Sequence, residues 1–462
     1  MPAERPRSLR KALQTAATVM VMGAVAAWAA ATHSVNHVSG VFLGIYYILL
    51  TASVLLYMAL AAFPLRSRYK RAAPGSVVAI IPSYNEENME GLHATVRSLI
   101  DQSRPVAAIH VVDDGSTVPV VPFDHPLVTW HRRPNGGKRA AQATAIEHIR
   151  RNGQSFDYVL TVDSDSEVHK DAVWQMLRVM NDRRVQACTG TVLVRNRHAS
   201  LLARLSDLNL FIFCVLSRGL RSALGVVNPT SGALSMYRAP VLFDNLGHYL
   251  ASGKDGDDRQ LCDYALMRGR VVSVPRAYVT TDMPDTVKGT YRQRLRWGKS
   301  GWRFIPWELT NLPTASLATR LIEVCTEALL PVLYLGLAAN VWRTGSADFL
   351  PHAFATAAVF MLAETLFYAI LRPGLSFAER LAAPLLVPCY TLMMFFVVYP
   401  AKYWSITKIK SDAWHTREPS AQAPPAHGRH RVGPRPPAPA KLLDPDTERT
   451  LETTLTIRTR PL

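Results

Sequence analysis

The stretch AAIHVVDDGS, residues 107–116, decides the fold class of this 462-residue chain, because a short apolar run ends there in two acidic residues, Asp113 and Asp114. An earlier β-branched run, Val77–Ile81, also ends in polar residues, and the segment Met89–Gln102 between the two runs is expected to be helical. Strand, helix and strand in this order, with polar groups at the strand ends, are typical of an open α/β sheet.

A third apolar run, Tyr158–Val162, leads directly into Asp163-Ser164-Asp165. In open α/β sheets ligands bind at the carboxyl ends of the strands, so the acidic strand ends are expected to line one crevice. Asp163 and Asp165 can direct one carboxylate at a nucleotide and the other at Mg²⁺ or Mn²⁺. A solvated loop start is the ordinary alternative for such a pair.

Two further segments are expected to line this crevice, the pair Asp113–Asp114 and the loop Asn135–Arg139. The first also has a purely structural explanation. The pair Asp113–Asp114 precedes Gly115, and Asp-Gly is also ordinary turn chemistry. The loop Asn135–Arg139, with the sequence NGGKR, is flexible and cationic and can approach phosphates. The chain has no Walker A sequence and no GxGxxG after a strand, which argues against the common ATP- and NAD-binding patterns.

A third acidic cluster, GDDR at residues 256–259, supplies carboxylates that can act as a base. A carboxylate that is positioned and partly desolvated can take a proton from an acceptor hydroxyl. The structural alternative, which is compatible with the first, is a helix over Arg259–Met267 whose N-terminus is favoured by Asp257 and Asp258.

The segment QRLRW at residues 293–297 combines three useful side-chain types. Arg offers forked donors to a diphosphate, Trp offers a flat apolar face to a sugar ring, and Gln can hydrogen-bond hydroxyls. A basic helix at a membrane surface is the alternative, because Arg and Trp also favour that boundary.

The chain is 48% hydrophobic and 19% charged, which is too apolar for a purely soluble protein of this length. Apolar stretches at Ala12–Thr32 and Val41–Phe63 precede the α/β pattern, and the second argues against a cleaved signal peptide. Three more follow at Ile322–Trp342, Phe349–Leu371 and Leu381–Tyr403. Basic residues at the outer ends of the first two predict a cytoplasmic N-terminus and a cytoplasmic domain after them.

Four parts are therefore expected. They are residues 1–73 with a basic segment and two transmembrane helices, 74–310 as a cytosolic catalytic domain with interfacial helices, 311–407 as transmembrane or interfacial helices, and 408–462 as a basic, Pro-rich disordered tail. Five spans would place the basic tail outside the cell, against the positive-inside tendency, so one of the last three stretches is expected to be interfacial or re-entrant.

The net charge bears on which partners the protein binds, and the cysteine content bears on zinc and disulfide sites. The net charge is +17, but Arg and Lys gather beside apolar segments and in the tail, where they would face anionic lipid. No basic helix with interleaved aromatics stands out, so a lipid bilayer and not a nucleic acid is the expected partner. The five cysteines form no CxxC and no Cys/His cluster, so neither a zinc site nor a disulfide scaffold is expected.

Taken together and in order, the motifs resemble the processive family-2 glycosyltransferases, the group of hyaluronan, chitin, chitooligosaccharide and cellulose synthases. The resemblance covers about residues 77–304. Four segments are similar to the bacterial hyaluronan synthases: TVDSD at 161–165, RNR at 195–197, SGALSMYR at 231–238 and GDDR at 256–259. The segment PDT at 284–286 is more similar to the nodulation-type chitooligosaccharide synthases, and Ala233 stands where the family has Pro.

This resemblance implies an α/β GT-A domain embedded between transmembrane α-helices, and it implies a role for each matching residue. Asp258 would be the catalytic base, and Asp165 would hold Mg²⁺ or Mn²⁺. The residues that would bind the nucleotide-sugar are Tyr84, Glu86, Asp113, Asp114, Lys138, Asp163 and Arg296. The residues that would bind the acceptor are Asp257, Gln293 and Trp297.

The implied function is an inverting, processive β-glycosyltransferase of the plasma membrane that polymerises UDP-sugars on the cytoplasmic side and threads the growing polysaccharide through its own helices. A hyaluronan-type product from UDP-GlcNAc and UDP-GlcA is the first expectation, with Arg294 and Arg259 as candidate donors to the uronate carboxylate. A GlcNAc polymer or chitooligosaccharide is the second, and a non-processive enzyme that glycosylates a lipid carrier is the third. A non-enzymatic basic membrane adaptor is the remaining alternative.

Overall fold

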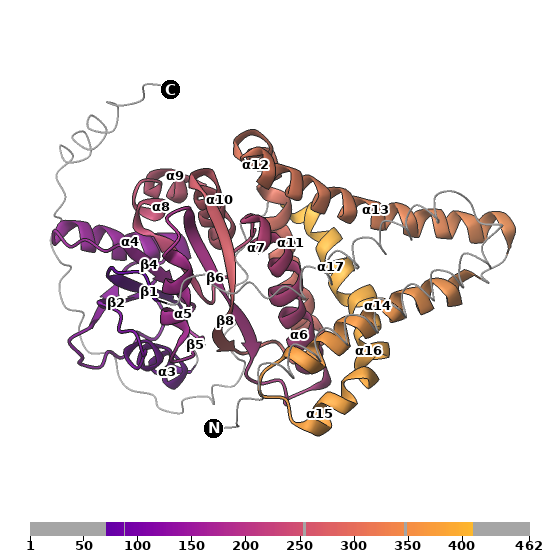
Figure 1. Cartoon of the computed structure of the whole chain (residues 1–462), viewed down its shortest axis with the longest axis horizontal. Helices are drawn as coiled ribbons and strands as arrows, with labels where there is room; N and C mark the ends of the chain where they lie inside the picture. Colours follow the sequence, from indigo (N-terminus) through magenta and orange to yellow (C-terminus); the bar gives the residue numbers. More distant parts are fainter. Residues whose placement is uncertain (1–70, 87, 253–255, 346–348, 410–462) are drawn as a thin grey trace, which may run out of the picture. The chain divides into compact units, whose positions relative to one another are not determined.

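The computed structural model describes residues 71–86, 88–252, 256–345 and 349–409, whose elements are shown in Figure 1. The two N-terminal apolar stretches and the tail beyond residue 409 lie outside the described residues. Within the described part, one eight-stranded sheet has the order β3-β2-β1-β4-β7-β6-β8-β5. Its strands are β1 (Val77–Ser83), β2 (Ala108–Asp113), β3 (Val128–Arg132), β4 (Tyr158–Thr161), β5 (Glu167–Val168), β6 (Val185–Val194), β7 (Ser235–Arg238) and β8 (Arg270–Thr281).

The three apolar runs that the sequence singled out are confirmed as β1, β2 and β4. They are neighbours in the sheet and run parallel, so their carboxyl ends meet at one edge. Ser83 at the end of β1 lies opposite Asp113 at the end of β2, and Ile80 lies opposite Thr161 at the end of β4. Asp163 follows two residues after that last strand. The sheet therefore brings the expected acidic strand ends together.

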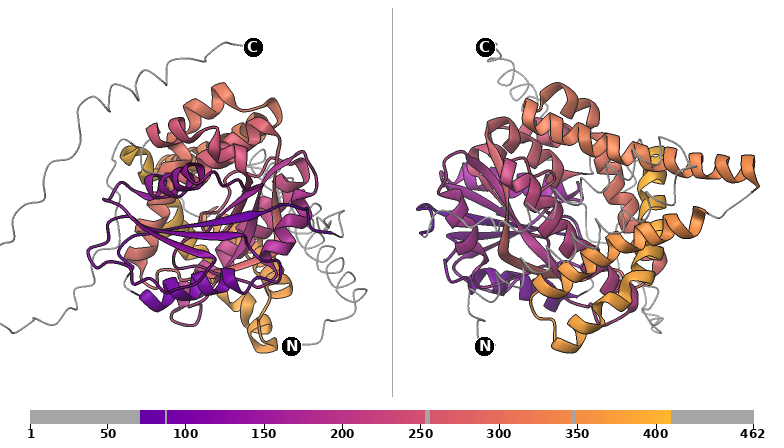
Figure 2. Two further views of the ribbon diagram at one scale, coloured as in Figure 1. Left: turned by 90° about the vertical axis from the view of Figure 1, so that its left-hand side faces the viewer. Right: turned by 45° about the vertical axis from the view of Figure 1, so that its right-hand side comes forward.

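Helices cover both faces of the sheet (Figures 1 and 2), because alternate residues of each strand point to opposite sides. Ala79 and Ile81 of β1 pack with α3 and α5, whereas Val78 and Ile80 pack with α4 and α10. The covering helices are α3 (Met89–Ile100), α4 (Lys138–Arg151), α5 (Ala172–Met180), α8 (Ala239–Phe243), α9 (Leu246–Ala251) and α10 (Asp257–Arg268).

The amphipathic segment that follows β6 forms α6 (Leu201–Ile212), a π-helical turn (Phe213–Ser217) and α7 (Arg218–Leu224). The Leu- and Phe-rich composition of this segment, with interspersed Arg, suits a core helix and an interfacial helix alike. In the structure α6 buries Leu205 and Leu208 in one cluster with residues of α14 (Phe349–Leu371) and α16 (Val387–Met393). α6 is therefore a core helix between the sheet and the C-terminal helices.

The C-terminal part is helical. Its elements are α11 (Val287–Arg303), α12 (Ile305–Asn311), α13 (Thr314–Thr344), α14 (Phe349–Leu371), α15 (Phe377–Ala382), η2 (Ala383–Leu386), α16 (Val387–Met393), η3 (Met394–Val398), α17 (Tyr399–Trp404) and η4 (Ser405–Lys408). Pro384, Pro388 and Pro400 each lie in the first turn of a short helix, where the missing N–H costs no hydrogen bond. The three prolines within the apolar stretch Leu381–Tyr403 therefore lie at joints between short helical segments.

One helical stretch among the described residues, Phe377–Lys408, is long and apolar enough to cross a membrane, and Phe360–Leu371 is a shorter apolar helix. The multi-pass arrangement as a whole stays a prediction. The acidic residues that interrupt the apolar pattern of α13 are paired. Glu323 lies 3.1 Å from Arg320 and 3.4 Å from Arg221, and Glu327 accepts a hydrogen bond from Lys402.

Candidate active site

Lys138 joins two of the acidic motifs at the carboxyl edge of the sheet. Its ammonium nitrogen lies 2.8 Å from Asp163 Oδ1 and 2.8 Å from Asp257 Oδ2. Lys138 is the first residue of α4, Asp163 follows β4, and Asp257 opens α10, so three distant segments of the chain meet at one cation. The Lys138 side chain is 16% exposed.

The electrostatics of this contact fix the charge of Lys138. Burial favours the neutral amine, but the carboxylates of Asp163, Asp257 and Asp258 outweigh burial and hold the pKa of Lys138 well above its usual value. Lys138 therefore stays positively charged and lies at the edge where ligands of an open α/β sheet bind. A fixed cation at that place can neutralise part of an anionic ligand.

Asp257 and Asp258 are neighbours in the chain but have opposite electrostatic environments. Burial alone would raise the pKa of Asp257, but the Lys138 ammonium lowers it below its usual value. Burial and the adjacent charge of Asp257 raise the pKa of Asp258. Asp258 Oδ1 accepts a hydrogen bond from the Arg259 backbone N–H at 2.8 Å. Of the two, Asp258 is the more basic carboxylate, as a general base requires.

The helix start that the sequence offered as an alternative is also present. α10 begins at Asp257, and both acids lie in its first turn, where the helix dipole favours negative charge. Gly256 precedes them with φ +73, and a Cβ added there would lie 2.6 Å from Phe304 Cε2 and 3.0 Å from Ser300 Cβ. Glycine is needed at this position for both its backbone angle and the close approach of α11.

Asp113 and Asp114 bind backbone groups of nearby loops in the structure. Asp113 Oδ1 accepts from the Ser116 backbone N–H at 2.9 Å, which closes the expected Asp-Gly turn. Asp114 accepts from the backbone N–H groups of Gly136 and Gly137, the latter at 2.6 Å. Asp114 therefore holds the glycine loop from which Lys138 emerges. Contact of either acid with a nucleotide stays a prediction.

Tyr84, Glu86 and Asp165 surround the same strand ends. Tyr84 and Glu86 follow β1 and are half-buried, and Glu86 accepts a hydrogen bond from Ser164 Oγ. Asp165 Oδ1 accepts from Thr281 Oγ1 at 3.3 Å, which ties the second acid of the Asp163-Ser164-Asp165 motif to the end of β8. The motif thus places its two carboxylates in different surroundings, one at Lys138 and one at β8.

Gln293, Arg296 and Trp297 lie on α11, whose final turn packs against Gly256. Gln293 Nε2 contacts Met283 Sδ at 3.4 Å, Arg296 is exposed, and Trp297 is 37% exposed. α11 also packs against α17, η3 and η4. This helix therefore connects the N-terminus of α10, which carries the acids, to the apolar C-terminal helices.

Comparison with known proteins identifies the family. The family described as Glycosyltransferase like family 2 matches residues 74–300. A hyaluronan synthase of Streptococcus pyogenes is 32% identical over 365 residues, which cover 74% of this chain and 83% of that relative. The chain belongs to the family-2 glycosyltransferases. An N-acetylglucosaminyltransferase of Rhizobium meliloti is 37% identical over 262 residues, covering 53% of this chain and 59% of that relative.

A solved structure shows the same fold as this glycosyltransferase. It is a mannosyltransferase from Pyrobaculum calidifontis in complex with GDP-Man and Mn²⁺, with a TM-score of 0.54 and 18% sequence identity. The match covers 80% of this chain and 98% of that structure. The GT-A-like α/β fold that the sequence predicted is therefore confirmed, together with the family and the general activity.

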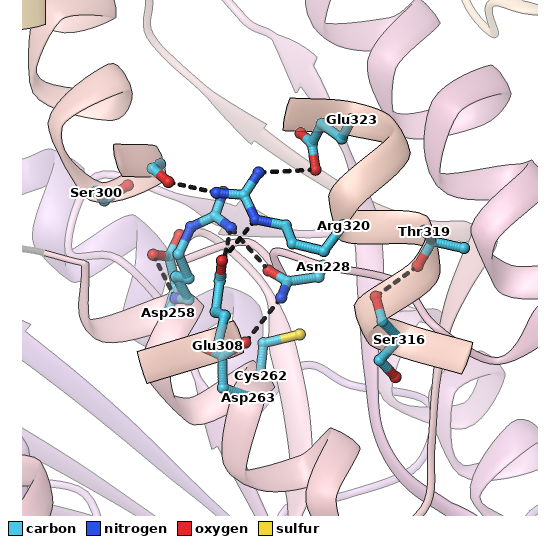
Figure 3. Close-up of polar contacts among 12 residues, drawn as sticks. Asn228, Asp258, Cys262, Asp263, Ser300, Glu308, Ser316, Thr319, Arg320 and Glu323 are labelled. Atoms are coloured by element: carbon cyan, nitrogen blue, oxygen red, sulfur yellow. Dashed lines mark hydrogen bonds and ion pairs between the residues drawn. The ribbon is translucent and has the colours of Figure 1, made fainter. Parts of the chain in front are cut away.

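A buried ion-pair network links α10, the helix that carries Asp258, to α12 and α13 (Figure 3). Arg259 Nη1 donates to Glu308 Oε1 at 3.0 Å and to Asn228 Oδ1 at 3.2 Å. The other oxygen of Glu308 accepts from Arg320 Nε at 2.6 Å, and the Glu308 side chain is 0% exposed. Because α12 and α13 supply Glu308 and Arg320, the network positions α10, and with it Asp258, against those helices.

Gly232 packs against the pair that joins Lys138 to Asp163. A Cβ at Gly232 would lie 2.9 Å from Lys138 Nζ and 3.1 Å from Asp163 Oδ2. We expect the added methyl group of Gly232→Ala to displace the Lys138 ammonium from its position beside Asp163. Nucleotide-sugar turnover should then fall by on the order of 10²-fold, the usual cost of misplacing a positioned group by about 1 Å. Turnover is measured as nucleotide release, and nucleotide affinity by calorimetry.

The matched control is Gly219→Ala in α7, because a Cβ at Gly219 meets nothing within 4 Å. This control variant is expected to keep wild-type turnover and nucleotide affinity. Wild-type turnover and affinity in Gly232→Ala as well would contradict the role of the Lys138–Asp163 pair.

Proposed function

We propose that the protein is a membrane-embedded, inverting, processive β-glycosyltransferase of the hyaluronan synthase type, which polymerises UDP-GlcNAc and UDP-GlcA. The observation that carries this proposal is the meeting of Lys138, Asp163 and Asp257 beside Asp258, whose pKa is raised by burial and by Asp257. α11 leads from this site to apolar helices, as an enzyme that passes its product into a membrane requires.

The nucleotide-sugar and the acceptor would be bound by different groups. The diphosphate would be neutralised by Lys138 and Arg296, while the acceptor end of the polymer would be held by Asp257, Gln293 and Trp297. The remaining residues proposed to bind the nucleotide-sugar are Tyr84, Glu86, Asp113, Asp114 and Asp163.

A divalent cation fits the residues at this edge. Among the described residues no group of three or more His, Cys, Asp or Glu side chains is arranged to hold a metal ion. Mg²⁺ and Mn²⁺ at nucleotide sites need only one or two carboxylates, because phosphate oxygens and water complete their shell. We propose Asp165 as the protein ligand. When bound, the ion adds positive charge at the diphosphate leaving group.

Inversion follows from a single displacement. The acceptor hydroxyl oxygen attacks the anomeric carbon from the face opposite UDP, and the bond from that carbon to the diphosphate oxygen breaks. The hydroxyl proton passes to Asp258, and the bonding electron pair leaves with UDP, whose charge is balanced by Lys138 and Arg296. The raised pKa of Asp258, caused by burial and Asp257, makes it a better proton acceptor than an ordinary Asp.

The membrane arrangement belongs to the same proposal. The catalytic domain, residues 74–310, would lie on the cytoplasmic side of the plasma membrane, with residues 1–73 and 311–407 supplying the membrane-embedded helices and 408–462 a basic tail. The growing polysaccharide would leave past α11 and through these helices. The candidate span Phe377–Lys408, on which α11 packs, supports this exit route.

Product analysis tests the proposal. We expect the full-length protein in lipid nanodiscs, supplied with both UDP-sugars, to produce a high-mass polymer that hyaluronidase degrades. Size separation of radiolabelled product measures this outcome. A single sugar on an extractable lipid would contradict processive synthesis and support the lipid-linked alternative.

A chitooligosaccharide or GlcNAc-polymer synthase is the second candidate. The similarity to the Rhizobium meliloti N-acetylglucosaminyltransferase and the segment Pro284–Thr286 favour it. It predicts a chitinase-sensitive product from UDP-GlcNAc alone.

A further inference from the structure

α11 buries an arginine, Arg294, that pairs with no carboxylate among the described residues. Arg294 is 7% exposed, and within the described residues its Nε and Nη2 atoms have no hydrogen-bond partner. Arg259 and Arg372 are similarly buried, but each donates to a carboxylate, Glu308 and Asp207 respectively. Because burying an unpaired charge is costly, an anion that bound to Arg294 would stabilise it.

Arg294 faces the C-terminal helices and not the nucleotide edge. Gly298, one turn later on the same face of α11, is so close to α17 and η4 that a Cβ would lie 2.5 Å from Ser405 Oγ. Burial lowers the pKa of Arg294 to about 10, and the nearby Tyr390 of α16 partly opposes this shift. Arg294 therefore stays charged at neutral pH.

The surroundings of Arg294 suit a sugar. Its guanidinium carbon lies 4.4 Å from the centre of the Trp297 ring, and the neighbouring Gln293 Oε1 is buried with no hydrogen-bond partner in the described part of the chain. One helical turn thus offers the flat apolar ring of Trp297 and two groups that can hydrogen-bond a sugar. Gln293 Oε1 can accept from a hydroxyl, and the Arg294 guanidinium can donate to a carboxylate. A planar fork of this kind matches a carboxylate better than a neutral hydroxyl.

Two other arginines are less suited to this role. Arg259, the other candidate that the sequence offered, is already occupied by Glu308 and Asn228. Arg296 lies two positions after Arg294, about 200° around the helix, and is exposed. Arg294 and Arg296 therefore lie on opposite faces of α11.

We propose that Arg294 binds the carboxylate of a uronate residue in the growing polymer, beside Trp297 and on the side of α11 that faces α16 and α17. This assignment rests on the proposed function, because it identifies the acceptor as a polymer that carries acidic sugars. The site would therefore bind the polymer and not the incoming nucleotide-sugar.

Binding of matched oligosaccharides tests the assignment. The probes are a hyaluronan hexasaccharide and its carboxyl-reduced counterpart, which has the same length but no charge, each titrated against the full-length protein in nanodiscs. We expect the wild-type protein to bind the charged probe about 10- to 100-fold more tightly, the usual range for a charge-assisted hydrogen-bond pair. Arg294→Gln should bind both probes equally, and Arg294→Lys should keep an intermediate preference.

The matched control is Arg292→Gln, which removes an exposed positive charge from the same helix and should keep the wild-type preference. An unchanged preference in Arg294→Gln, or no preference in the wild-type protein, would overturn the assignment. A loss of UDP affinity in Arg294→Gln as large as the loss of the charged probe would also overturn it, because the anion would then be the diphosphate. If Arg294→Gln does not fold, Arg294→Lys and the wild-type preference decide.

The failure of this assignment can be told apart from failure of the proposed function. Wild-type protein that turns over UDP-sugars but does not prefer the charged probe would contradict the Arg294 site alone. Wild-type protein that releases no UDP from any UDP-sugar would contradict the proposed function, whatever the probes show.

Discussion

Replacement of Asp258 by Asn is expected to lower glycosyl transfer by about 10²- to 10⁴-fold, the usual contribution of a general base. The change removes the carboxylate that would take the acceptor proton, but it leaves the Lys138 contacts with Asp163 and Asp257 in place. UDP affinity should therefore stay close to that of the wild-type protein. UDP release and calorimetric titration with UDP measure the two quantities.

The pH dependence of transfer gives a second readout of the same residue. Asp258 must be unprotonated to act as a base, and its pKa is raised by burial and by the neighbouring Asp257. Activity should therefore begin to fall at a higher pH than the ordinary Asp pKa of about 3.9 predicts as the solution is acidified. The acidic limb that belongs to Asp258 should be absent from the residual activity of Asp258→Asn.

Asp244→Asn provides the control for this variant, because Asp244 forms a half-exposed pair with Arg268 away from the catalytic acids. It should retain wild-type transfer and pH dependence. A loss of less than about tenfold in Asp258→Asn would show that another group is the base.

Replacement of Glu308 by Ala is expected to lower the stability of the folded protein by about 3–5 kcal/mol, the usual cost of breaking a buried ion pair. The change leaves Arg259 and Arg320 buried without the carboxylate that both share. Because Arg259 directly follows Asp258, transfer by the surviving folded protein should also fall. Thermal denaturation in detergent measures the first effect and UDP release the second.

Glu308→Gln tests the charge of Glu308 alone, because it keeps the size of the side chain and removes only the negative charge. This variant should still destabilise the protein. Glu147→Gln is the surface control, because the Glu147–Arg151 pair is exposed and such pairs contribute less than about 1 kcal/mol. Denaturation midpoints equal to wild type in both Glu308 variants would contradict a structural role for the network.

Three strands of the sheet and the acidic residues at their ends were predictable from the sequence because local patterns encode them. The runs that became β1, β2 and β4 are apolar, short and followed by polar residues, and parallel pairing then places their ends together. The start of α10 was also visible, because Asp257 and Asp258 are favourable in a first turn. Motif order was sufficient to identify the family.

The contacts that position the site were not predictable, because they join residues without a shared motif. Arg259 and Glu308 are 49 positions apart, and Glu308 and Arg320 are 12 apart. The sequence analysis therefore did not identify Asn228, Glu308 and Arg320. The charge of Arg320, directly before the apolar stretch that begins at Ile322, could have indicated a buried ion pair. Gly232 lay in a recognised segment, but its contact with Lys138 depends on how β7 approaches β4.

Asp114 shows a further limit of sequence reasoning. Turn chemistry and ligand binding predict the same residue types, so the sequence cannot choose between them. In the structure Asp114 binds the backbone of Gly136 and Gly137 and so supports Lys138. A residue can thus be required at a site because it holds the loop that carries a functional side chain.

UDP release by the purified full-length protein tests the central claim most directly, with UDP-GlcNAc alone, UDP-GlcA alone and both together. A hyaluronan-type polymerase adds each sugar to the other, so sustained release is predicted only when both donors are present. Release from UDP-GlcNAc alone at the rate of the mixture would contradict the two-sugar account.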